Sequence, residues 1–476
     1  MNAGNLFSLT LILCLALPGI GRAQPQPALP RRLMFDSPSS GNLLPQQGNL
    51  LEHFVYPNGG FLTLGVAQVN REERGFVTRR FADGRLDTGF GTQGIASLPG
   101  EHGSRPLHMR VDARGRILVI GMEFPSRMER GMGRNRAVLY RLNPDGTPDL
   151  TWGEAGTLLL PGVASERHWV SIMDFTLLPG NWLAIAFVHL QGRSPVRGGQ
   201  DIHRAAILVI NEEGEPHPSF GEEGLAIPET ADPLHFSALR ILRSERQGDF
   251  IVYGSAQFAQ GRYPMNRLHA FLGRITAQGT WDTRVGDGKG YILRMMGEGF
   301  PQTDANQSIL THALELPDGR IAAAGYWLSS GLNRKFDSFV AVFQSDGTPD
   351  PRFGERNTGI SVLPRTTQPD WAFWLNRLPN GDFLVAGTNA RGGYLQRISS
   401  DGQRSLWQVE GLSTNTIEFR AAMHPNGNSI LTGGQAADPV SLVWQQHDTQ
   451  GRPLPRWSPA AENGRLRAFL ATMPED

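Results

Sequence analysis

Short apolar runs, each about six residues long, recur through most of this 476-residue chain. Two examples are Arg116–Gly121 and Ala137–Leu142, which are rich in β-branched and aliphatic residues. Asn-Gly or Asp-Gly pairs stand beside many of the runs, and such pairs supply the positive φ angles that tight hairpin turns require. Apolar runs of this length between such turns predict β-strands joined as hairpins.

Two sequence motifs repeat along the chain, and each occurs seven times. The first is a turn followed by an apolar run, as in LPDGRIAAAG (316–325) and LPNGDFLVAG (378–387). The second is a longer turn segment, as in FADGRLDTGFGTQG (81–94) and LNPDGTPDLTWGEAG (142–156). Four strands per unit and seven units predict an all-β fold, a seven-bladed β-propeller of four-stranded blades. The turn glycines of the second motif are Gly84, Gly146, Gly214, Gly279, Gly347, Gly402 and Gly451.

Both ends of the repeat array resemble the last strand of a unit. Residues 35–47 and residues 463–472 each match the segment that ends a repeat, which makes one such strand more than seven blades need. We therefore expect one terminal strand to complete a blade begun by the other end, closing the ring and removing exposed sheet edges. The expected propeller spans 35–472, with a short tail at 473–476.

The N-terminal segment has the pattern of a signal peptide. Leu6–Leu17 is apolar but shorter than the roughly 20 residues that span a membrane. Gly21-Arg22-Ala23 places small residues at a cleavage site, so we expect a signal peptide at 1–23 and a Pro-rich linker at 24–34; a buried apolar strand is the alternative. The single cysteine, Cys14, falls inside this segment, which leaves the mature chain without disulfides or thiolate ligands. The expected location is the periplasm, the cell surface or the extracellular space of a bacterium.

Composition narrows the class of protein further. The chain contains 57 Gly and 33 Pro, and 19% of its residues are charged, which argues against a helical protein. Lys and Arg together number 45, as do Asp and Glu, so no bulk charge favours nucleic acid. Neither the N-terminal run nor any other stretch is long and apolar enough to cross a bilayer.

The repeated units resemble the delta-60 repeat, in which a PDG hairpin is followed by a segment close to RLNPDGxxDxxFGxxG. The resemblance covers about residues 51–457, and the sixth and seventh units lack the FGxxG element. It implies a propeller in an exported bacterial protein and implies no general activity.

The repeated acidic and basic residues have a structural and a functional interpretation. Paired aspartates could bind calcium, but aspartates in turns ordinarily bond to their own backbone, which we favour. The recurring arginines of the third strand could line an anion site, but we expect them to pair with a turn aspartate of a neighbouring blade. The residues are Asp83, Asp87, Asp145, Asp149, Asp346 and Asp350, with Arg79, Arg141, Arg274 and Arg397.

Three histidines lie at similar points of first strands, six or seven residues before the hairpin glycine: His53, His108 and His312. The innermost strand of a propeller blade faces the central channel. Three converging imidazoles could hold Zn²⁺ with an open position for water. The alternative, which we favour, is that they line the channel or point into the blades, and we expect no cofactor.

The loops between second and third strands should emerge on one face, at residues 66–75, 122–137, 187–204, 255–269, 326–337, 388–392 and 434–440. Several are rich in arginine and aromatic residues, a combination that suits carboxylated or phosphorylated partners. The candidate binding residues are Arg127, Arg130, Arg134, Arg136, Arg193, Arg197, Arg262, Tyr263, Arg267, Trp327 and Arg334.

The sequence favours a non-catalytic binding scaffold over an enzyme and leaves both open. No GxSxG, HExxH or phosphate-binding loop is present in the sequence. The expected partner of the scaffold is a protein or an anionic polysaccharide of the cell envelope, and we expect a monomer. The alternative function is a hydrolase or lyase with a metal or acid–base site in the central channel.

Overall fold

The computed structural model describes residues 47–452 apart from short gaps. The gaps are 70–71, 101–102, 124–135, 161–169, 194–200, 232–233, 246–247, 259–266, 298–306, 329–335, 364–368, 390, 411–419, 426, 428, 438–439 and 451. The expected signal peptide and linker therefore lie outside the described residues, as does the expected tail.

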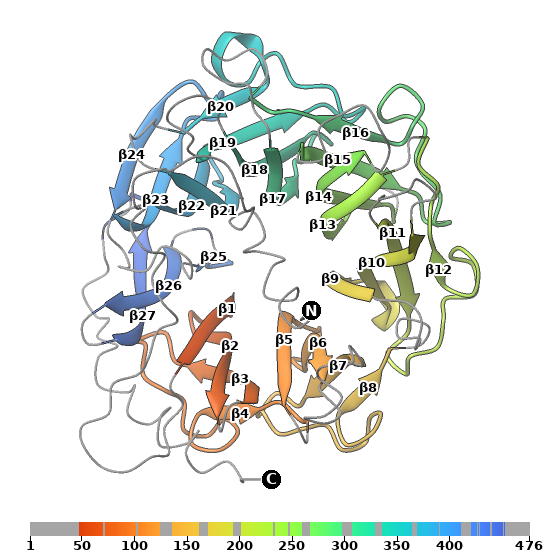
Figure 1. Cartoon of the computed structure of the whole chain (residues 1–476). Helices are drawn as coiled ribbons and strands as arrows, with labels where there is room; N and C mark the ends of the chain where they lie inside the picture. The colour runs from red at the N-terminus through yellow and green to blue at the C-terminus, as the bar shows by residue number, and fades with distance from the viewer. Residues whose placement is uncertain are drawn as a thin grey trace, which may run out of the picture.

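The described chain forms antiparallel sheets arranged around one axis, a propeller (Figure 1). Blade 1 contains β1 (Gln47–Val55), β2 (Phe61–Val69), β3 (Glu72–Arg80) and β4 (Ile95–Ser97), and blade 2 contains β5 (Ser104–Val111), β6 (Ile117–Glu123), β7 (Arg136–Leu142) and β8 (Thr157–Leu159). Blade 3 contains β9 (Val170–Leu177), β10 (Leu183–Arg193), β11 (Asp201–Ile210) and β12 (Leu225–Ala226), and blade 4 contains β13 (Leu234–Arg243), β14 (Phe250–Phe258), β15 (His269–Ile275) and β16 (Tyr291–Arg294). Blade 5 contains β17 (Gln307–Glu315), β18 (Ile321–Leu328), β19 (Phe336–Phe343) and β20 (Ile360–Val362), and blade 6 contains β21 (Asp370–Arg377), β22 (Phe383–Asn389), β23 (Gly392–Ile398) and β24 (Ser405–Glu410). A further sheet contains β25 (Arg420–Met423), β26 (Ser429–Ala437) and β27 (Val440–Asp448), and single 3₁₀ turns lie at η4 (Pro179–Asn181) and η5 (Glu355–Asn357).

Six of these sheets are four-stranded blades, and the sheet β25–β27 has three described strands. The sequence predicts seven four-stranded blades, and the described residues form six of them. The segments expected to supply a closing strand, 35–47 and 463–472, lie outside the described residues except for Gln47, which begins β1.

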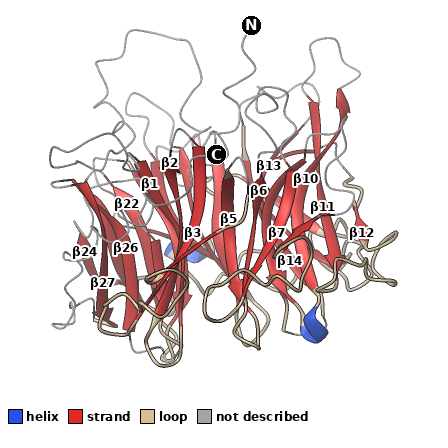
Figure 2. Cartoon of the chain, turned by 90° about the horizontal axis from the view of Figure 1, so that it is seen from below, coloured by secondary structure: helices blue, strands red, loops and turns tan. Residues whose placement is uncertain are grey.

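The first strand of each sheet lies nearest the axis, as the repeat pattern predicts. Figure 1 shows β1, β5, β9, β13, β17, β21 and β25 around the centre, and Figure 2 shows the strands running roughly along the axis. Successive blades also pack through these strands, since β9 contacts β13 and β17 contacts β21. Side chains on the axial side of first strands are therefore brought together from distant parts of the chain.

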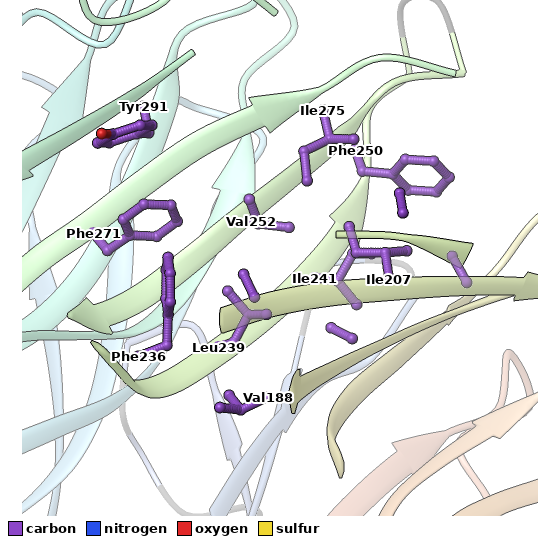
Figure 3. Packing of buried hydrophobic residues seen from close by; sticks show 14 of the residues in the cluster. Val188, Ile207, Phe236, Leu239, Ile241, Phe250, Val252, Phe271, Ile275 and Tyr291 are labelled. Atoms are coloured by element: carbon purple, nitrogen blue, oxygen red, sulfur yellow. The ribbon is translucent and has the colours of Figure 1, made fainter. Parts of the chain in front are cut away.

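Apolar side chains fill the space between neighbouring blades. Figure 3 shows one such core, in which Val188 and Ile207 of blade 3 pack with residues of blade 4. Within it, the rings of Phe236 and Phe271 meet edge to face, with centroids 4.9 Å apart. Full burial of an aromatic side chain of this size stabilises a fold by about 1.5–3 kcal/mol. Because both faces of a blade are covered in this way, the second strands read as nearly continuous apolar runs.

The FGxxG elements of blades 1 and 5 join these blades to the ones that follow them. In blade 1, the Gly91 N–H donates a hydrogen bond to the Asp145 carbonyl of blade 2 over 2.6 Å, and the Phe90 ring lies directly beneath Gly146. Gly354 bonds to the Asp401 carbonyl in the same way over 2.7 Å, where blade 5 meets blade 6. The recurrence of this motif is therefore explained by packing between blades.

The repeated aspartates and arginines also belong to the scaffold. Asp145 accepts a hydrogen bond from the Thr147 N–H at 2.9 Å, which confirms the turn role of the first aspartate. For Arg79 the expected partner, a turn aspartate of a neighbouring blade, was wrong: Arg79 pairs with Asp87 of its own repeat at 2.7 Å, and only its bond to the Pro144 carbonyl, at 2.6 Å, crosses to the next blade. Arg141 pairs with Asp149 of its own repeat at 2.9 Å and also with a turn carboxylate of the next blade, Glu212, at 3.2 Å.

Candidate functional site

The first strand of each four-stranded blade contains a β-bulge at the same level along the axis. At this point the strand carries one residue more than its partner strand, so the pairing shifts by one. The extra residue and the one that follows it are mostly part-exposed on the axial side, between buried neighbours. The extra residues are Leu51, Leu107, Met173, Ser237, Thr311 and Phe373, and those that follow are Glu52, His108, Asp174, Ala238, His312 and Trp374.

His53 does not join the other two predicted histidines. It pairs with Thr63 in the ladder, one position beyond the level of His108 and His312, and successive strand residues face opposite sides of a sheet. Its side chain is buried, and its Nδ1 lies 3.0 Å from the Thr63 hydroxyl. The three histidines therefore do not all converge, as the less favoured zinc interpretation requires, and within the described residues no group of three His, Cys, Asp or Glu side chains is arranged to hold a metal ion.

In place of that trio, charged and imidazole groups from five blades meet near the axis. We call this set the axial cluster: Glu52, His108, Arg110, Asp174, Arg240 and His312. They come from β1, β5, β9, β13 and β17.

Arg110 forms ion pairs with both carboxylates of the axial cluster. Its Nη1 lies 2.8 Å from Glu52 Oε1, and its Nη2 lies 3.0 Å from Asp174 Oδ1. The backbone supplies more donors, since the Met109 N–H bonds to Glu52 at 2.7 Å and the Phe175 N–H bonds to Asp174 at 2.9 Å. Both carboxylates are thus held in fixed positions, and the single charge of Arg110 balances one of their two negative charges.

Burial by itself would raise the pKa of Glu52. The Arg110 charge and the hydrogen bond from His108 outweigh burial and hold the pKa of this carboxyl far below its usual range. Glu52 is therefore ionised throughout the neutral pH range.

His108 connects these carboxylates to Arg240. Arg240 Nη1 donates a hydrogen bond to His108 Nε2, while His108 Nδ1 lies 3.5 Å from Glu52 and 3.9 Å from Asp174. Because a guanidinium group can only donate, Nε2 must present its lone pair, which places the ring proton on Nδ1, toward the carboxylates. A carboxylate–imidazole–guanidinium chain therefore orients Arg240.

Arg240 differs from Arg110 in its surroundings. Among the residues that the structure describes, no carboxylate oxygen lies within 4.0 Å of its guanidinium, whose contact is the His108 ring. A guanidinium carries five N–H donors, so most of those on Arg240 remain for another partner.

His312 lies beside Arg240 at the same end of the cluster. Burial lowers the pKa of His312 to about 4, and the Arg240 charge acts in the same direction, so the ring is neutral near pH 7. Its Nδ1 is buried and makes no hydrogen bond with any described residue. On its other side, the centroid of its ring lies 6.5 Å from that of Trp374, at an interplanar angle of 48°.

The predicted loop-face residues are only partly described. Arg136, the first residue of β7, is exposed and lies 3.2 Å from Glu123, and Arg267 is exposed next to β15. Arg193 is the last residue of β10, and its side chain is not among those described. The others, Arg127, Arg130, Arg134, Arg197, Arg262, Tyr263 and Arg334, lie outside the described residues.

Trp327 was wrongly placed in a binding loop. It belongs to β18, only 1% of its surface is exposed, and its ring stacks on that of Phe339 with centroids 5.1 Å apart. The strands continue further than the apolar runs indicate, so the loops are shorter than expected. In blade 3 the β10–β11 pairing reaches Arg193 and Asp201, which leaves 194–200 of the expected loop 187–204.

Sequence reasoning missed most of the axial cluster. Arg110 and Arg240 each lie two residues after the position that follows the bulge of their strand. Because side chains two residues apart in a strand face the same side, His108 points to Arg110. Asp174 lies six residues before its hairpin glycine Gly180, whereas His108 lies seven residues before Gly115, so counting back from the hairpin glycine misses Asp174 by one residue.

The described residues include no helix long and apolar enough to cross a membrane.

No family model matches the chain, and no curated protein matches it. Among solved structures it is similar to a protein of unknown function from Dyadobacter fermentans, with 12% identity over 89% of this chain and 95% of that one, at a TM-score of 0.43. It is also similar to the polysaccharide lyase Uly1, with 10% identity over 93% and 95% of the two chains, at a TM-score of 0.47. An ulvan lyase structure matches with 9% identity over 85% and 97%, at a TM-score of 0.46. Similarity at this level carries no argument about activity.

Proposed function

We propose that this protein is an exported β-propeller that binds a negatively charged group of a partner, a protein or an anionic polysaccharide, and that Arg240 in the axial cluster receives that group. The observation that carries the proposal is the contrast between the two arginines. Arg110 is neutralised by two carboxylates, whereas the described surroundings of Arg240 place no carboxylate within 4.0 Å. An oriented guanidinium with spare donors suits a carboxylate, sulfate or phosphate group, to which it can donate two parallel hydrogen bonds.

The placement of charge supports an anion at this end of the cluster. The formal charges of Glu52, Asp174, Arg110 and Arg240 sum to zero, but both carboxylates already accept several hydrogen bonds. At His312, the charge of Arg240 has a stronger influence than that of either carboxylate. Arg240 is therefore the charge that acts most strongly at His312.

The protonation states favour binding over proton transfer. Glu52 stays ionised and His312 stays neutral near pH 7, because their pKa values are lowered. Groups with fixed charge recognise a ligand by complementarity, while a general acid or base works best with a pKa near the operating pH.

The loop face and the two chain ends complete the proposal. The arginine-rich loops extend the contact beyond the axis, beside the exposed Arg136 and Arg267.

The N-terminal segment directs export, and the units are delta-60 repeats. One terminal segment, 35–47 or 463–472, adds the fourth strand to the sheet β25–β27 and closes a seven-bladed ring; the contacts of β25 and β26 with β1 support this arrangement.

The test compares two arginine variants of the full chain. R240Q removes the charge in the axial cluster, and R85Q removes an exposed arginine from an outer turn of blade 1 as a control. Binding to polyglucuronate, with neutral dextran as the reference polymer, should weaken at least tenfold in R240Q, because a hydrogen bond to a charged group contributes about 1.5–3 kcal/mol. The proposal fails if R240Q binds polyglucuronate as tightly as the natural chain.

A hydrolase or lyase is the second candidate, and the position of His108 favours it. An imidazole oriented by a carboxylate is suited to proton abstraction once the neighbouring Arg240 turns to a substrate carboxylate and frees the Nε2 lone pair of His108. Release of shortened or unsaturated products from polyglucuronate, lost in H108Q, would place this candidate first.

A further inference from the structure

Trp374 stands at the same level of the axis as His108 and His312. The bulge of β21 lies between Ala372 and Trp374, and it places Trp374 as the bulges of β5 and β17 place the two histidines. Trp374 is partly exposed, and its inner part packs against the core between blade 6 and the sheet β25–β27. An aromatic group therefore faces the axis next to the imidazole of His312.

Three kinds of recognition group follow one another around the axis. Blade 4 contributes the Arg240 guanidinium, blade 5 the neutral His312 ring, and blade 6 the Trp374 indole. The wall formed by blades 1 to 3 is different, because there Glu52, Arg110 and Asp174 satisfy one another. The side of the axis formed by blades 4 to 6 is thus the side with unused hydrogen-bonding capacity.

We propose that the ligand received by this side of the axis is an acidic sugar residue, with its carboxylate or sulfate on Arg240, a ring hydroxyl on His312 and its ring face against Trp374. This inference rests on the proposed function and specifies its ligand. A carboxylate or sulfate alone needs only the guanidinium. A hydroxyl group both donates and accepts, so it can form a hydrogen bond with a neutral imidazole in either tautomer. The apolar face of a pyranose ring can pack flat against an indole ring, whereas a flexible aliphatic acid cannot cover the indole surface.

The experiment uses oligosaccharides that differ in one group. The probes are a β-1,4-linked tetramer of glucuronic acid, the corresponding glucose tetramer, glucose 6-sulfate, glucuronate and acetate, each titrated calorimetrically into the full chain. The variants are R240Q, W374L and W374F, with W182L as the control, since Trp182 is partly exposed beside the turn η4 and away from the axis. Circular dichroism and the melting temperature establish that each variant is folded, and W374F keeps an aromatic ring if W374L does not fold.

The expected result is binding of the glucuronic acid tetramer at least tenfold tighter than the glucose tetramer. W374L should weaken that binding about tenfold, W374F should weaken it less, and W182L should leave it unchanged. Comparable binding of glucose 6-sulfate and glucuronate would show that the anionic group can be either sulfate or carboxylate, while binding of one of them alone would assign it.

Two results would overturn the inference, and they separate it from the proposed function. If W374L binds the glucuronic acid tetramer normally, or acetate binds as tightly as glucuronate, while R240Q loses binding, the anion site stands and the sugar is wrong. If no anionic probe binds, or R240Q binds all of them normally, the proposed function fails together with the inference.

Discussion

Replacing His312 by glutamine should make the protein less sensitive to acid. The folded state holds the imidazole neutral, because burial and the Arg240 charge lower its pKa to about 4 from the ordinary value of 6.5. Between these two values the unfolded chain takes up a proton that the folded chain does not. Stability therefore falls as the pH decreases from 6.5 towards 4. Glutamine keeps a polar side chain of similar reach and removes this titration.

The size of the effect follows from the difference between the two pKa values. A difference of this size corresponds to at most about 3 kcal/mol, and about 2 kcal/mol of it is expressed between pH 7 and pH 4.5. Other groups titrate in the same range, but they do so equally in the natural chain and in the variant. The contribution of His312 is therefore the difference between the two proteins.

Urea unfolding followed by tryptophan fluorescence at pH 7 and at pH 4.5 measures this difference. The natural chain should lose about 2 kcal/mol more than H312Q on acidification. H217Q, which alters an outer turn of blade 3, should lose as much as the natural chain. Equal losses in the natural chain and in H312Q would refute the view that His312 is a buried neutral group beside Arg240.

Two further predictions concern the scaffold. D350N should destabilise the fold by about 2 kcal/mol at pH 7: burial would raise the pKa of Asp350, but hydrogen bonds from Arg352 and Arg320 lower it to about 2. This stabilisation is present when the pH is above 3.8, the ordinary pKa of an aspartate, and it is lost as the pH falls toward 2. The stability of D350N and that of the natural chain should therefore converge toward pH 2, and a constant difference between them would contradict the assignment. G146A should destabilise by about 2–3 kcal/mol, because a Cβ at this positive φ of 86° would lie 2.7 Å from the Phe90 ring. G115A provides the matched control, because φ is also positive there, at 78°, but the added Cβ makes only ordinary van der Waals contact with the Pro144 ring, at 3.6 Å. It should lose about 1 kcal/mol in the same urea titration, and equal losses would remove the role assigned to Phe90.

Much of the fold could be predicted from the sequence because its determinants are local. Gly84 and Gly146 adopt the positive φ angles that their turns require, and the runs Arg116–Gly121 and Ala137–Leu142 largely became β6 and β7. The repetition of these local signals seven times also indicated which strand of each unit would lie innermost.

The candidate site could be predicted only in part, for a physical reason. His108 and His312 were found, because alternation along a strand is a local property. His53 was misplaced, because it lies six residues before its hairpin glycine, whereas His108 and His312 lie seven residues before theirs. A difference of one residue turns a strand side chain to the opposite face. Trp327 was misplaced because strand pairing, which depends on the partner strand, continued through the expected loop.

What the sequence by itself determined is the set of strands, their turns and their order around an axis, since each depends on residues close together in the chain. What only the tertiary structure decided is which charges meet at that axis. His108 and Arg240 are 132 positions apart, and Arg110 reaches Glu52 and Asp174 from 58 and 64 positions away. Contacts at such separations depend on how the bulged strands pack around the ring, and that packing left Arg240, unlike Arg110, without a carboxylate partner among the described residues.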